Sequence, residues 1–549
     1  MTLPDSSIQF IPLGGFGEIG MNCMAICASN QILIIDCGVL FPAEPRLGVD
    51  TIHASFDFLL EHEKAIAGLV ATHGHEDHIA AIPFLLQKIN VPVFAGAYTN
   101  GLLRVRFTEF DNLNPTVLTN IYPGKPFQIG PFAIEPLQMP HSTVDNFALL
   151  ISCSGHRIFH TSDFKLNLHS SNPGQLIKKL ESLRPVDVMI SDSTGALESS
   201  DAGDESALEE SIGALVESAP GRVFIALFSS NVRRIRTFIK IAQRTGRKLV
   251  MSGKSVLNHY AIARDTGIIP AADGTVIPVQ KAHHFSNSEL LILMSGTQGE
   301  SRSALGRFAG GRHAQFNAND TDTVILSSRF IPGNELQISQ TISRLMTQGV
   351  TVYHSNNRDD IHVSGHGSRN EILAAIEAVR PNALLPAHGT YEHLKATALI
   401  AQHAGINSTI IATNGDVVTF ANGSLSITDT IDAKKIHIEK NVSIPDEVLR
   451  MRRNAGNQGV VALWITIEKS ATGDQTVNVR QQSTGVVSDD LFSSSATEIE
   501  RIVKDTVKEN SSSHQDMAQH IKIAVRKLFR QTYKRNPVFM IDVIQNSKQ

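Results

Sequence analysis

The 549-residue sequence has little cysteine, no strong excess of either charge and no long apolar run. Its four cysteines lack the spacing of a zinc ribbon or a disulfide framework, so we expect reduced, buried thiols. A formal charge of −4 excludes the globally basic footprint of many nucleic-acid binders, so a nucleic-acid groove would have to be local. No run is long enough to cross a bilayer, and the first residues lack signal-peptide features. These absences predict a cytoplasmic protein without membrane partners.

The segment THGHEDH, residues 72–78, concentrates ligand-type side chains at one point of the chain. Residues 67–71 are typical of a short buried strand and residues 79–86 of an amphipathic helix. His73 and His75 should point to one side of the extended segment, whereas Asp77 and His78 should start the helix. An aspartate that merely caps the helix would leave three histidines unexplained. We therefore predict ligands for two metal positions.

Two neighbouring cations need more ligands than one loop offers, and three later segments supply candidates. His141 follows a proline, Asp163 follows the segment HRIFH, and His388 ends the apolar run NALLPA. A lone histidine at a strand end is more often packed or solvated than bound to a metal. Because a strand followed by a ligand recurs here several times, the pattern predicts one site along a sheet edge.

Length and spacing indicate several domains. The chain exceeds what one core usually supports, and the stretch between Asp163 and His388 is long enough for an inserted domain. Within it, residues 221–255 alternate strand, helix and strand, which predicts a βαβ unit in a parallel sheet. Two further strands end in SGTQGES and in SSRFIPGNE, where small polar residues suit either an anion site or an ordinary turn.

The motif His-x-His-x-Asp-His, followed by a separate His, an Asp and a last His, resembles the metallo-β-lactamase superfamily, and LIIDCG supplies its strand-end Asp36. The resemblance implies that one metal is held by His73, His75 and His141, the other by Asp77, His78 and His388, and that Asp163 bridges them. Zinc is the default ion, two per chain, and similar ligand sets tolerate manganese. Such a pair suits phosphodiester hydrolysis.

The inserted domain resembles the β-CASP branch, whose members cut nucleic acids, and the closer match is to the ribonuclease J family. The segments that carry this match are PLGGFGEIGMN, DCGVLFPAEPRLGVD, THGHEDHIAAIPFLL, SGTQGE, IPGNE and HVSGHG. The implied fold is α/β: a metallo-β-lactamase αββα sandwich, an inserted β-CASP α/β domain and a small C-terminal α/β domain. We expect the sandwich at 1–205 and 355–420, the insertion at 206–354, edge strands and a linker at 421–450, and the last domain at 451–549.

The resemblance implies a ribonuclease that cuts RNA internally and trims it from the 5′ end, favouring a 5′-monophosphate, in RNA maturation and mRNA decay. Asp192 would orient His366, which would stabilise or protonate the departing oxygen, and these two with Asp77 form the expected catalytic set. The expected substrate-binding residues are His362, Val363, Ser364, Gly365, His366, Ser295 and Gly296. Their hydroxyl and backbone N–H donors suit a compact anion. No basic residue is assigned to this pocket, so a triphosphate should be excluded.

The chain departs from the family after SDST, where an acidic stretch contains Glu198, Asp201, Asp204 and Glu205. A charge run is usually a solvated face, and we expect the same here. SGTQGES also differs from the family's usual Ser-Gln-Gly-Glu-Pro. Neither change touches an expected metal ligand.

The last hundred residues form a further unit. VVALWITIEK and PVFMIDVIQ indicate strands, and the helix between them carries an apolar stripe of Met517, Ile521, Val525, Leu528 and Tyr533. Its basic residues could bind an RNA backbone, although basic helix faces are more often solvated; they are Lys522, Arg526, Lys527, Arg530, Lys534 and Arg535. The resemblance favours oligomerisation instead, as a homodimer or homotetramer, and allows RNA-decay proteins as partners.

Three other functions compete with this hypothesis. A DNA-directed β-CASP nuclease would lack the HVSGH and GGFGEIG segments. A small-molecule metallo-hydrolase would not need the inserted domain. A non-catalytic RNA-binding paralogue would tend to lose ligands, and all seven are present.

Overall fold

The computed structural model describes residues 7–42, 47–168, 173–199, 203, 205–270, 274–331, 333–469, 475–509 and 514–547. The chain divides into two units, residues 1–43 with 51–436 and residues 44–50 with 437–549. No helix of the described residues is long and apolar enough to cross a membrane. The four cysteines are free and buried, as predicted.

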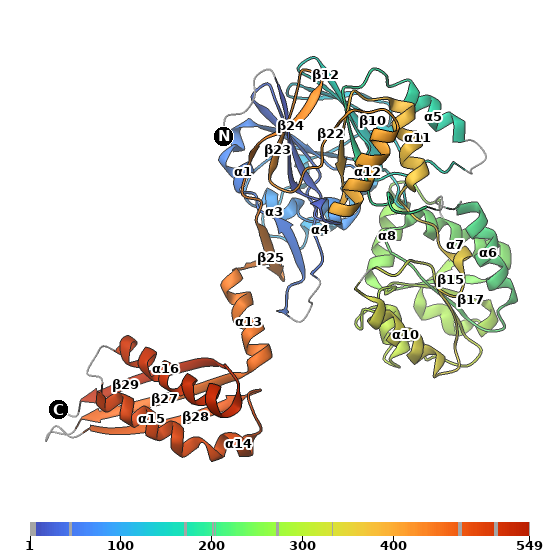
Figure 1. The fold of residues 1–549 in the computed structure, drawn as a ribbon. Helices are drawn as coiled ribbons and strands as arrows, with labels where there is room; N and C mark the ends of the chain where they lie inside the picture. Colours follow the sequence, from blue (N-terminus) through green and yellow to red (C-terminus); the bar gives the residue numbers. More distant parts are fainter. Residues whose placement is uncertain are drawn as a thin grey trace. The chain divides into compact units, whose positions relative to one another are not determined.

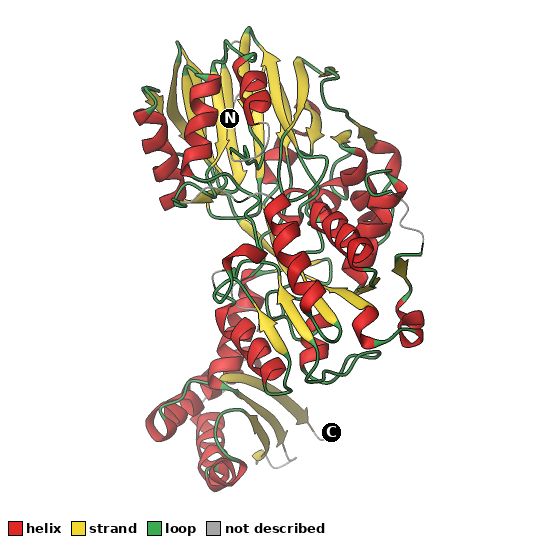
Figure 2. Ribbon diagram, turned by 90° about the vertical axis from the view of Figure 1, so that its right-hand side faces the viewer, coloured by secondary structure: helices red, strands yellow, loops and turns green. Residues whose placement is uncertain are grey.

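Two facing sheets form the sandwich of the first unit (Figures 1 and 2). The first runs β24 (Ser424–Thr430), β23 (Asp416–Ala421), β1 (Ile8–Gly14), β3 (Cys23–Ala28), β4 (Gln31–Ile35), β6 (Ile66–Val70), β7 (Val93–Ala95) and β8 (Leu118–Asn120). The second runs β22 (Ser408–Thr409), β20 (Ala383–Ala387), β13 (Val188–Asp192), β12 (His156–His160), β11 (Phe147–Cys153), β10 (Phe132–Gln138) and β9 (Phe127–Ile129). Alternate residues of both sheets, such as Phe10 and Leu149, meet in one buried cluster between them.

Helices complete the sandwich. α5 (Pro173–Glu181), α11 (Arg369–Val379) and α12 (Tyr391–His403) accompany the second sheet, whose outer residues form a buried cluster with Ile372, Ile376 and Ile400. The chain between strands of the first sheet contains α1 (Asp57–Glu61), α2 (Glu76–Ile79), α3 (Ile82–Leu86) and α4 (Ala97–Phe107). Figure 2 shows helices outside the paired sheets, so the predicted αββα sandwich is confirmed.

The inserted domain has its own parallel sheet, in the order β16 (Val276–Ile277), β15 (Lys248–Ser252), β17 (Leu290–Met294), β14 (Val223–Ala226), β18 (Thr323–Leu326) and β19 (Thr351–Tyr353). One face is covered by α6 (Glu205–Ser218), α7 (Val232–Thr245) and α8 (Lys254–Asp265), the other by α9 (Ala304–Ala309) and α10 (Glu335–Met346). The predicted βαβ unit is therefore confirmed as β14, α7 and β15.

The second unit contains a three-stranded sheet. β27 (Val460–Lys469) pairs antiparallel with β28 (Gln475–Thr484) and parallel with β29 (Val538–Ser547). α15 (Ala496–Glu509) and α16 (His514–Tyr533) cover one face, and the unit also contains α13 (Asp446–Gln458) and α14 (Asp489–Ser494). β25 (Lys435–Glu439) and β26 (Val442–Ile444) form a hairpin before α13. The predicted strands and long helix are confirmed, whereas β28 and α13–α15 were not anticipated, and the expected boundary at 450 falls inside α13.

The apolar stripe of α16 packs against its own sheet. Met517, Ile521 and Val525 are buried, as predicted, but the next core position is Phe529, while Leu528 is only partly buried. A helical period of 3.6 residues places Phe529 four residues after Val525 on the same face. The stripe therefore needs no external partner surface.

Candidate metal centre

The loop after β6 carries the first group of predicted ligands. His73 and His75 follow the strand in a short loop, with His75 in extended conformation, and α2 begins at Glu76 and carries Asp77 and His78. The expected strand-to-helix turn is thus present. The single helix predicted for residues 79–86 is instead two short helices, because α2 ends at Ile79 before α3 begins.

Gly38 of the segment LIIDCG lets this loop pack directly on the preceding strand end. A Cβ atom at Gly38 would lie 1.7 Å from the backbone oxygen of Asp77. Beside it, the backbone N–H of Cys37 donates to the oxygen of His78 at 2.8 Å. Any side chain at position 38 would therefore displace two predicted metal ligands.

The second sheet delivers the other three predicted ligands to the same place. His141 follows β10, Asp163 follows β12, and His388 directly follows β20. β10 and β12 both pair antiparallel with β11, and β20 runs parallel to β13 and β12, so the three strands end at one edge. This is the arrangement that the repeated pattern of strand and ligand predicts.

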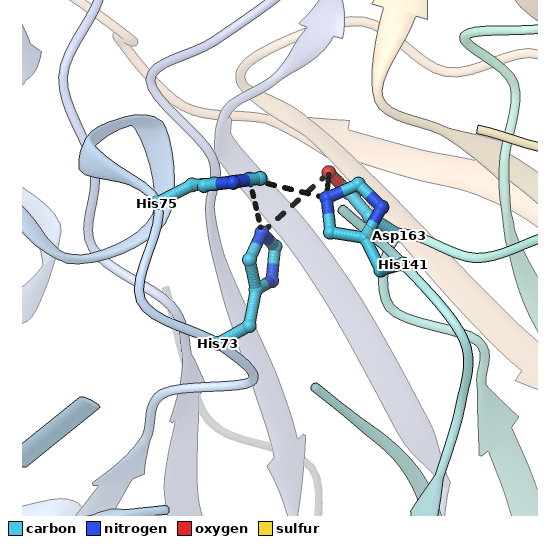
Figure 3. A group of neighbouring side chains, drawn as sticks. All are labelled: His73, His75, His141 and Asp163. Carbon is cyan, nitrogen blue, oxygen red and sulfur yellow. Dashed lines mark hydrogen bonds and ion pairs between the residues drawn. The ribbon is translucent and has the colours of Figure 1, made fainter. Parts of the chain in front are cut away.

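The seven side chains form two adjoining clusters. In the first, the Nδ1 atom of His75 lies 3.0 Å from Nε2 of His73 and 3.1 Å from Nε2 of His141 (Figure 3). Oδ2 of Asp163 lies 3.7 Å from Nε2 of both His73 and His141. One ligand atom from each of the four residues lies within 4.8 Å of the others, which is the spacing of donors around a single ion.

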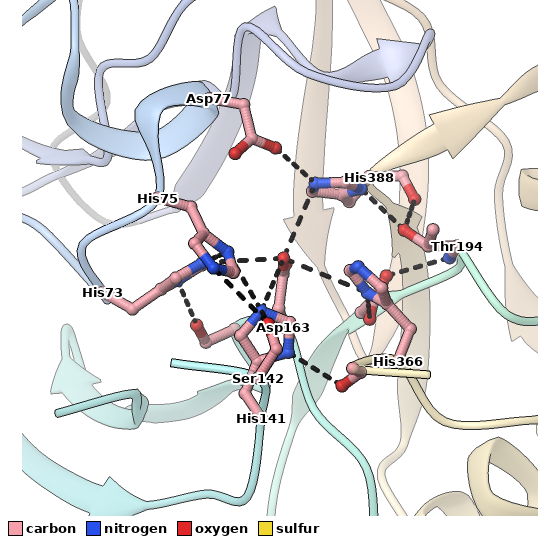
Figure 4. A network of polar contacts seen from close by, with 12 residues as sticks. His73, His75, Asp77, His141, Ser142, Asp163, Thr194, His366 and His388 are labelled. Atoms are coloured by element: carbon pink, nitrogen blue, oxygen red, sulfur yellow. Dashed lines mark hydrogen bonds and ion pairs between the residues drawn. The ribbon is translucent and has the colours of Figure 1, made fainter. Parts of the chain in front are cut away.

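Asp77, His78 and His388 form the second cluster. Oδ2 of Asp77 lies 3.5 Å from Nε2 of His78 and 3.2 Å from Nε2 of His388. Oδ2 of Asp163 is 3.4 Å and 3.8 Å from the same two nitrogen atoms. Figure 4 shows Asp163 between the two groups of histidines, where its carboxylate can serve both.

Charge and burial in this centre suit cations. Burial keeps the pKa of His73 and His141 well below its usual value and lowers that of His75 to about 4, so these rings are neutral donors. Burial opposes charge on His388, yet Asp163 and the hydrogen bond with Asp77 raise its pKa to about 9. The buried carboxylates thus draw positive charge into the site, and a metal ion can supply it in place of protons.

A surrounding layer of oxygen atoms orients the rings. Nδ1 of His78 donates to Asp36 at 2.8 Å, and Nδ1 of His141 donates to the oxygen of Gly365 at 2.8 Å. Nδ1 of His388 lies 2.7 Å from the hydroxyl of Thr194. In each case Nε2 is left facing the cluster, as it is in histidines that bind metals. The donor set therefore fits a pair of bound cations.

Sequence reasoning missed part of this layer. Asp36 was anticipated, and it also accepts from the backbone N–H and hydroxyl of Thr72 at 2.7 Å and 2.9 Å. Asn22 and Thr194 were not anticipated. Nδ2 of Asn22 lies 3.0 Å from Nε2 of His78, and the hydroxyl of Thr194 contacts His388. Both stand inside the quoted segments GEIGMN and SDST, but neither residue type signals a metal ligand.

The segment HVSGHG brings a further histidine to the site. Nδ1 of His366 donates to Oδ2 of Asp192 at 2.9 Å and lies 4.0 Å from Oδ2 of Asp163. Asp192 ends β13, next to the strand that leads to His388. Although burial opposes it, Asp192 and Asp163 raise the pKa of His366, so this ring can carry a proton.

Two buried basic residues, Arg234 and Lys165, bond to the same segment, whereas the sequence predicted no basic residue for this pocket. Arg234 is buried, its Nη1 lies 3.1 Å from Nδ1 of His362, and its Nη2 donates to the oxygen of Val363 at 3.3 Å. Nζ of buried Lys165 donates to the oxygen of Ser364 at 3.1 Å. These contacts fix the backbone of the loop.

The acidic stretch after SDST is only partly the expected solvated face. Glu205 pairs with buried Arg234 at 2.9 Å, because the start of α6 packs beside α7, so the prediction is wrong for this residue. Exposed Glu198 pairs with Arg329 at 2.7 Å. Asp201 and Asp204 lie outside the described residues.

Ser295 and Gly296 follow β17 in the inserted domain. The oxygen of Ser295 accepts from the N–H of Leu305 at 3.1 Å, and Gly296 has a φ of 113°. A Cβ at Gly296 would meet Oγ of Ser303 at 2.0 Å. The turn thus requires glycine both for its positive φ and for its packing, and a substrate contact here stays a prediction.

Comparisons with known proteins agree with this architecture. Four family descriptions match successive parts of the chain: "Beta-lactamase superfamily domain" at residues 33–225, "Ribonuclease J, beta-CASP domain" at 220–345, "Zn-dependent metallo-hydrolase RNA specificity domain" at 356–411 and "Ribonuclease J C-terminal domain" at 447–546. A solved structure, a protein of unknown function from Enterococcus faecalis, shares the fold with a TM-score of 0.55 and 15% identity over 75% of this chain and 100% of its own.

Curated relatives extend over nearly the whole sequence. Ribonuclease J of Corynebacterium glutamicum is 32% identical over 98% of this chain and 76% of its own length. Ribonuclease J 1 of Streptococcus pyogenes is 29% identical over 100% of this chain and 99% of its own. Ribonuclease J of Mycobacterium tuberculosis is 31% identical over 99% of this chain and 98% of its own length. The chain therefore belongs to the ribonuclease J family of metallo-hydrolases.

Proposed function

We propose that this member of the ribonuclease J family hydrolyses RNA phosphodiesters with two metal ions, held by the residues that the sequence predicts. His73, His75 and His141 would hold one ion, Asp77, His78 and His388 the other, and Asp163 would bridge them. Two zinc ions suit these imidazole and carboxylate donors, and manganese is an alternative. The observation that carries the proposal is the convergence of all seven proposed ligands from both sheets in two adjoining clusters, with His366 beside them.

The ions, when bound, would activate a water nucleophile and neutralise charge on the phosphate. The chain itself supplies the remaining functions. Oδ2 of Asp192 accepts a hydrogen bond from the Nδ1–H of His366 and thereby orients the ring, whose Nε2 has no hydrogen bond to another described residue. From this position His366 would stabilise or protonate the departing oxygen. Asp163 links the two clusters, because its carboxylate lies close to histidine nitrogen atoms of both, and Asp77 belongs to the second cluster.

Recognition of the 5′ end would use the HVSGHG loop. The hydroxyl of Ser364 accepts from the backbone N–H of His366 at 3.1 Å, so the loop is closed on itself. Together with His362, Val363, Gly365, Ser295 and Gly296, it would hold a terminal monophosphate. Lys165 and Arg234 are buried behind the loop and add positive potential without facing solvent. These features support 5′→3′ trimming that favours a monophosphate end, alongside internal cleavage, in RNA maturation and decay.

Assembly would use the second unit. The open face of its sheet exposes Trp464, Met540 and Ile544, whereas the other face is covered by α15 and α16. An apolar patch of this kind on a sheet surface favours association. We propose a homodimer or homotetramer formed through this face, with RNA-decay proteins as further partners.

One assay compares the competing functions. The purified protein is given 5′-monophosphorylated RNA, DNA of the same sequence, and a β-lactam, each with and without a chelator. We expect chelator-sensitive turnover of RNA alone. Preferred cleavage of DNA would support a DNA-directed β-CASP nuclease, turnover of the β-lactam a small-molecule hydrolase, and RNA binding without turnover a non-catalytic paralogue.

A second assay examines the 5′ pocket. The enzyme should degrade 5′-monophosphorylated RNA to mononucleotides faster than 5′-triphosphorylated RNA. Ser364→Ala should narrow that difference while internal cleavage persists, because the loop loses one donor. Equal exonucleolytic rates on both ends in the unmodified enzyme would refute the pocket and leave an endonuclease with the same metal centre.

A further inference from the structure

A polar cleft lies where two helices of the second unit end. It is lined by Asn454, Gln458, Arg530, Lys534, Arg535 and Asn536 and has a volume of about 550 Å³. Asn454 and Gln458 belong to the last turns of α13, Arg530 to the last turn of α16, and the other three directly follow α16. We call this feature the C-terminal cleft. Three of its six residues are cations and none is acidic.

The three cations of the C-terminal cleft have no carboxylate partner within the described part of the chain. Arg530, Lys534 and Arg535 are all exposed. On α15 of the same unit, by contrast, Arg501 pairs with Glu498 at 2.7 Å and Lys504 pairs with Glu500 at 2.6 Å. Like charges that share a small space repel each other, and a bound anion would relieve that repulsion.

The backbone fixes this arrangement. Lys534 has a φ of 54°, which turns the chain sharply at the end of α16. The backbone N–H of Asn536 then donates to Oε1 of Gln458 at 3.0 Å, which ties the turn to α13. Stabilisation of the helix dipole explains a cation such as Arg530 in the last turn. It does not explain Lys534 and Arg535, because they lie beyond the helix.

We propose that the C-terminal cleft, which belongs to a different unit from the predicted metal ligands, binds the phosphodiester backbone of single-stranded RNA. This inference rests on the proposed function. Consecutive phosphates provide closely spaced anions, and side-chain amides such as those of Asn454 and Gln458 commonly bond to phosphate and sugar. The cleft has no aromatic or apolar lining on which a base could stack, so binding should be independent of sequence.

The test removes the three charges from the full-length, metal-loaded enzyme with Arg530→Gln, Lys534→Gln and Arg535→Gln combined. The matched control removes three positive charges from α15 with Arg501→Gln, Lys504→Gln and Lys508→Gln. Binding is measured over a range of salt concentrations on a long single-stranded RNA with phosphorothioate linkages, which resist hydrolysis. The cleft variant should bind about tenfold more weakly, with a salt slope smaller by about 2, since each lost phosphate contact removes about 0.7.

The control variant should keep the binding constant and slope of the unmodified enzyme. An unchanged slope in the cleft variant, or an equal loss in the control, overturns the proposal and would leave the cleft as a site for an acidic protein segment. If the triple variant misfolds, Lys534→Gln alone still tests it, with an expected slope change of about 0.7. Cleavage of a 5′-monophosphorylated pentanucleotide should be unaffected. If the enzyme binds long RNA through the cleft but cuts no RNA, the proposed nuclease function is wrong, whereas the proposed RNA binding by the cleft is supported.

Discussion

Oδ2 of Asp192 accepts a hydrogen bond of 2.9 Å from Nδ1 of His366, which joins the end of β13 to the loop that leads into α11. The bond fixes the orientation of the ring and favours its protonated form, because the carboxylate stabilises the positive charge. A histidine held in this way next to a metal centre is suited to protonate a departing oxygen.

Asp192→Asn should therefore lower kcat on RNA by roughly 10²-fold, the scale of general acid catalysis. His366→Gln should have a similar effect, and the double variant should be little worse than either, because the two residues act as a unit. Metal content, measured by mass spectrometry, should stay at the unmodified level. Loss of metal from Asp192→Asn would mean that this carboxylate serves as a ligand instead.

Removal of Asp77 tests the second metal position. Asp77→Ala deletes a proposed ligand whose side chain is 28% exposed at the edge of the sheet, so the fold should persist. RNA hydrolysis should fall by at least roughly 10–100-fold, the effect of losing even an outer partner of a metal ligand. Exposed Glu76 next to it is the matched control, and Glu76→Ala should retain activity. Near-normal turnover by Asp77→Ala would rule out the two-metal assignment.

The features that sequence could predict are local ones. An apolar run that is followed by a polar residue such as Asp163 or His388 indicates a buried strand with a polar group at its end. In each case the apolar run and the polar residue lie within ten residues of each other, so a short stretch of sequence shows both. The strand of VVALWITIEK was likewise predictable from its β-branched residues. β28 was not, because QTVNVRQQST presents mostly polar residues on an edge strand with one covered face.

Long-range contacts explain the rest. Arg234 stands in the segment NVRRIR, which is typical of a solvated helix face, yet it is buried because α6, α7 and the HVSGHG loop close around it. Asn22 and His78 are far apart in sequence, and only the folded sandwich brings their nitrogen atoms to 3.0 Å. Periodicity shows which residues face a core, but it does not show which polar side chains meet inside it.

The buried guanidinium of Arg234 should be a structural requirement of the active-site loop. Its Nη1 donates to the oxygen of Ser327 at 3.0 Å, and its Nη2 bonds to Glu205 and to the loop. Arg234→Met would leave these oxygen atoms without a partner, which should cost about 3 kcal/mol of unfolding free energy in urea titrations. RNA turnover should also fall as the loop loosens. Arg236→Met, at an exposed position of α7, should change stability by less than about 0.5 kcal/mol. Equal stability of the two variants would contradict the role of Arg234.

Lowering the pH should reduce the free energy of unfolding of the first unit, because His53 is buried there. Its ring stacks on Phe56 with centroids 4.6 Å apart, and burial lowers its pKa to about 4 although the hydrogen bond to Ala54 opposes the shift. Between pH 6.5 and 4 the unfolded chain binds a proton that the folded chain does not, so stability falls as pH falls. The loss reaches about 3 kcal/mol near pH 4. His53→Gln lacks this group, so its unfolding free energy should depend less on pH over that window. Parallel pH profiles for both proteins would contradict the assignment.

The open face of the C-terminal sheet should hold the proposed oligomer together. β27 places Trp464 opposite Arg480 of β28 and Asp542 of β29, and Trp464 and Met540 are 42% and 63% exposed. Because side chains alternate along a strand, neither residue contributes to the core that α15 and α16 cover on the other face. Trp464→Glu combined with Met540→Glu places two charges in the proposed interface, and sedimentation velocity should show smaller particles. Ile523→Glu, at a 56% exposed position of α16, is the matched control and should leave the particle size unchanged. If the double variant sediments like the unmodified protein, subunits associate through another surface.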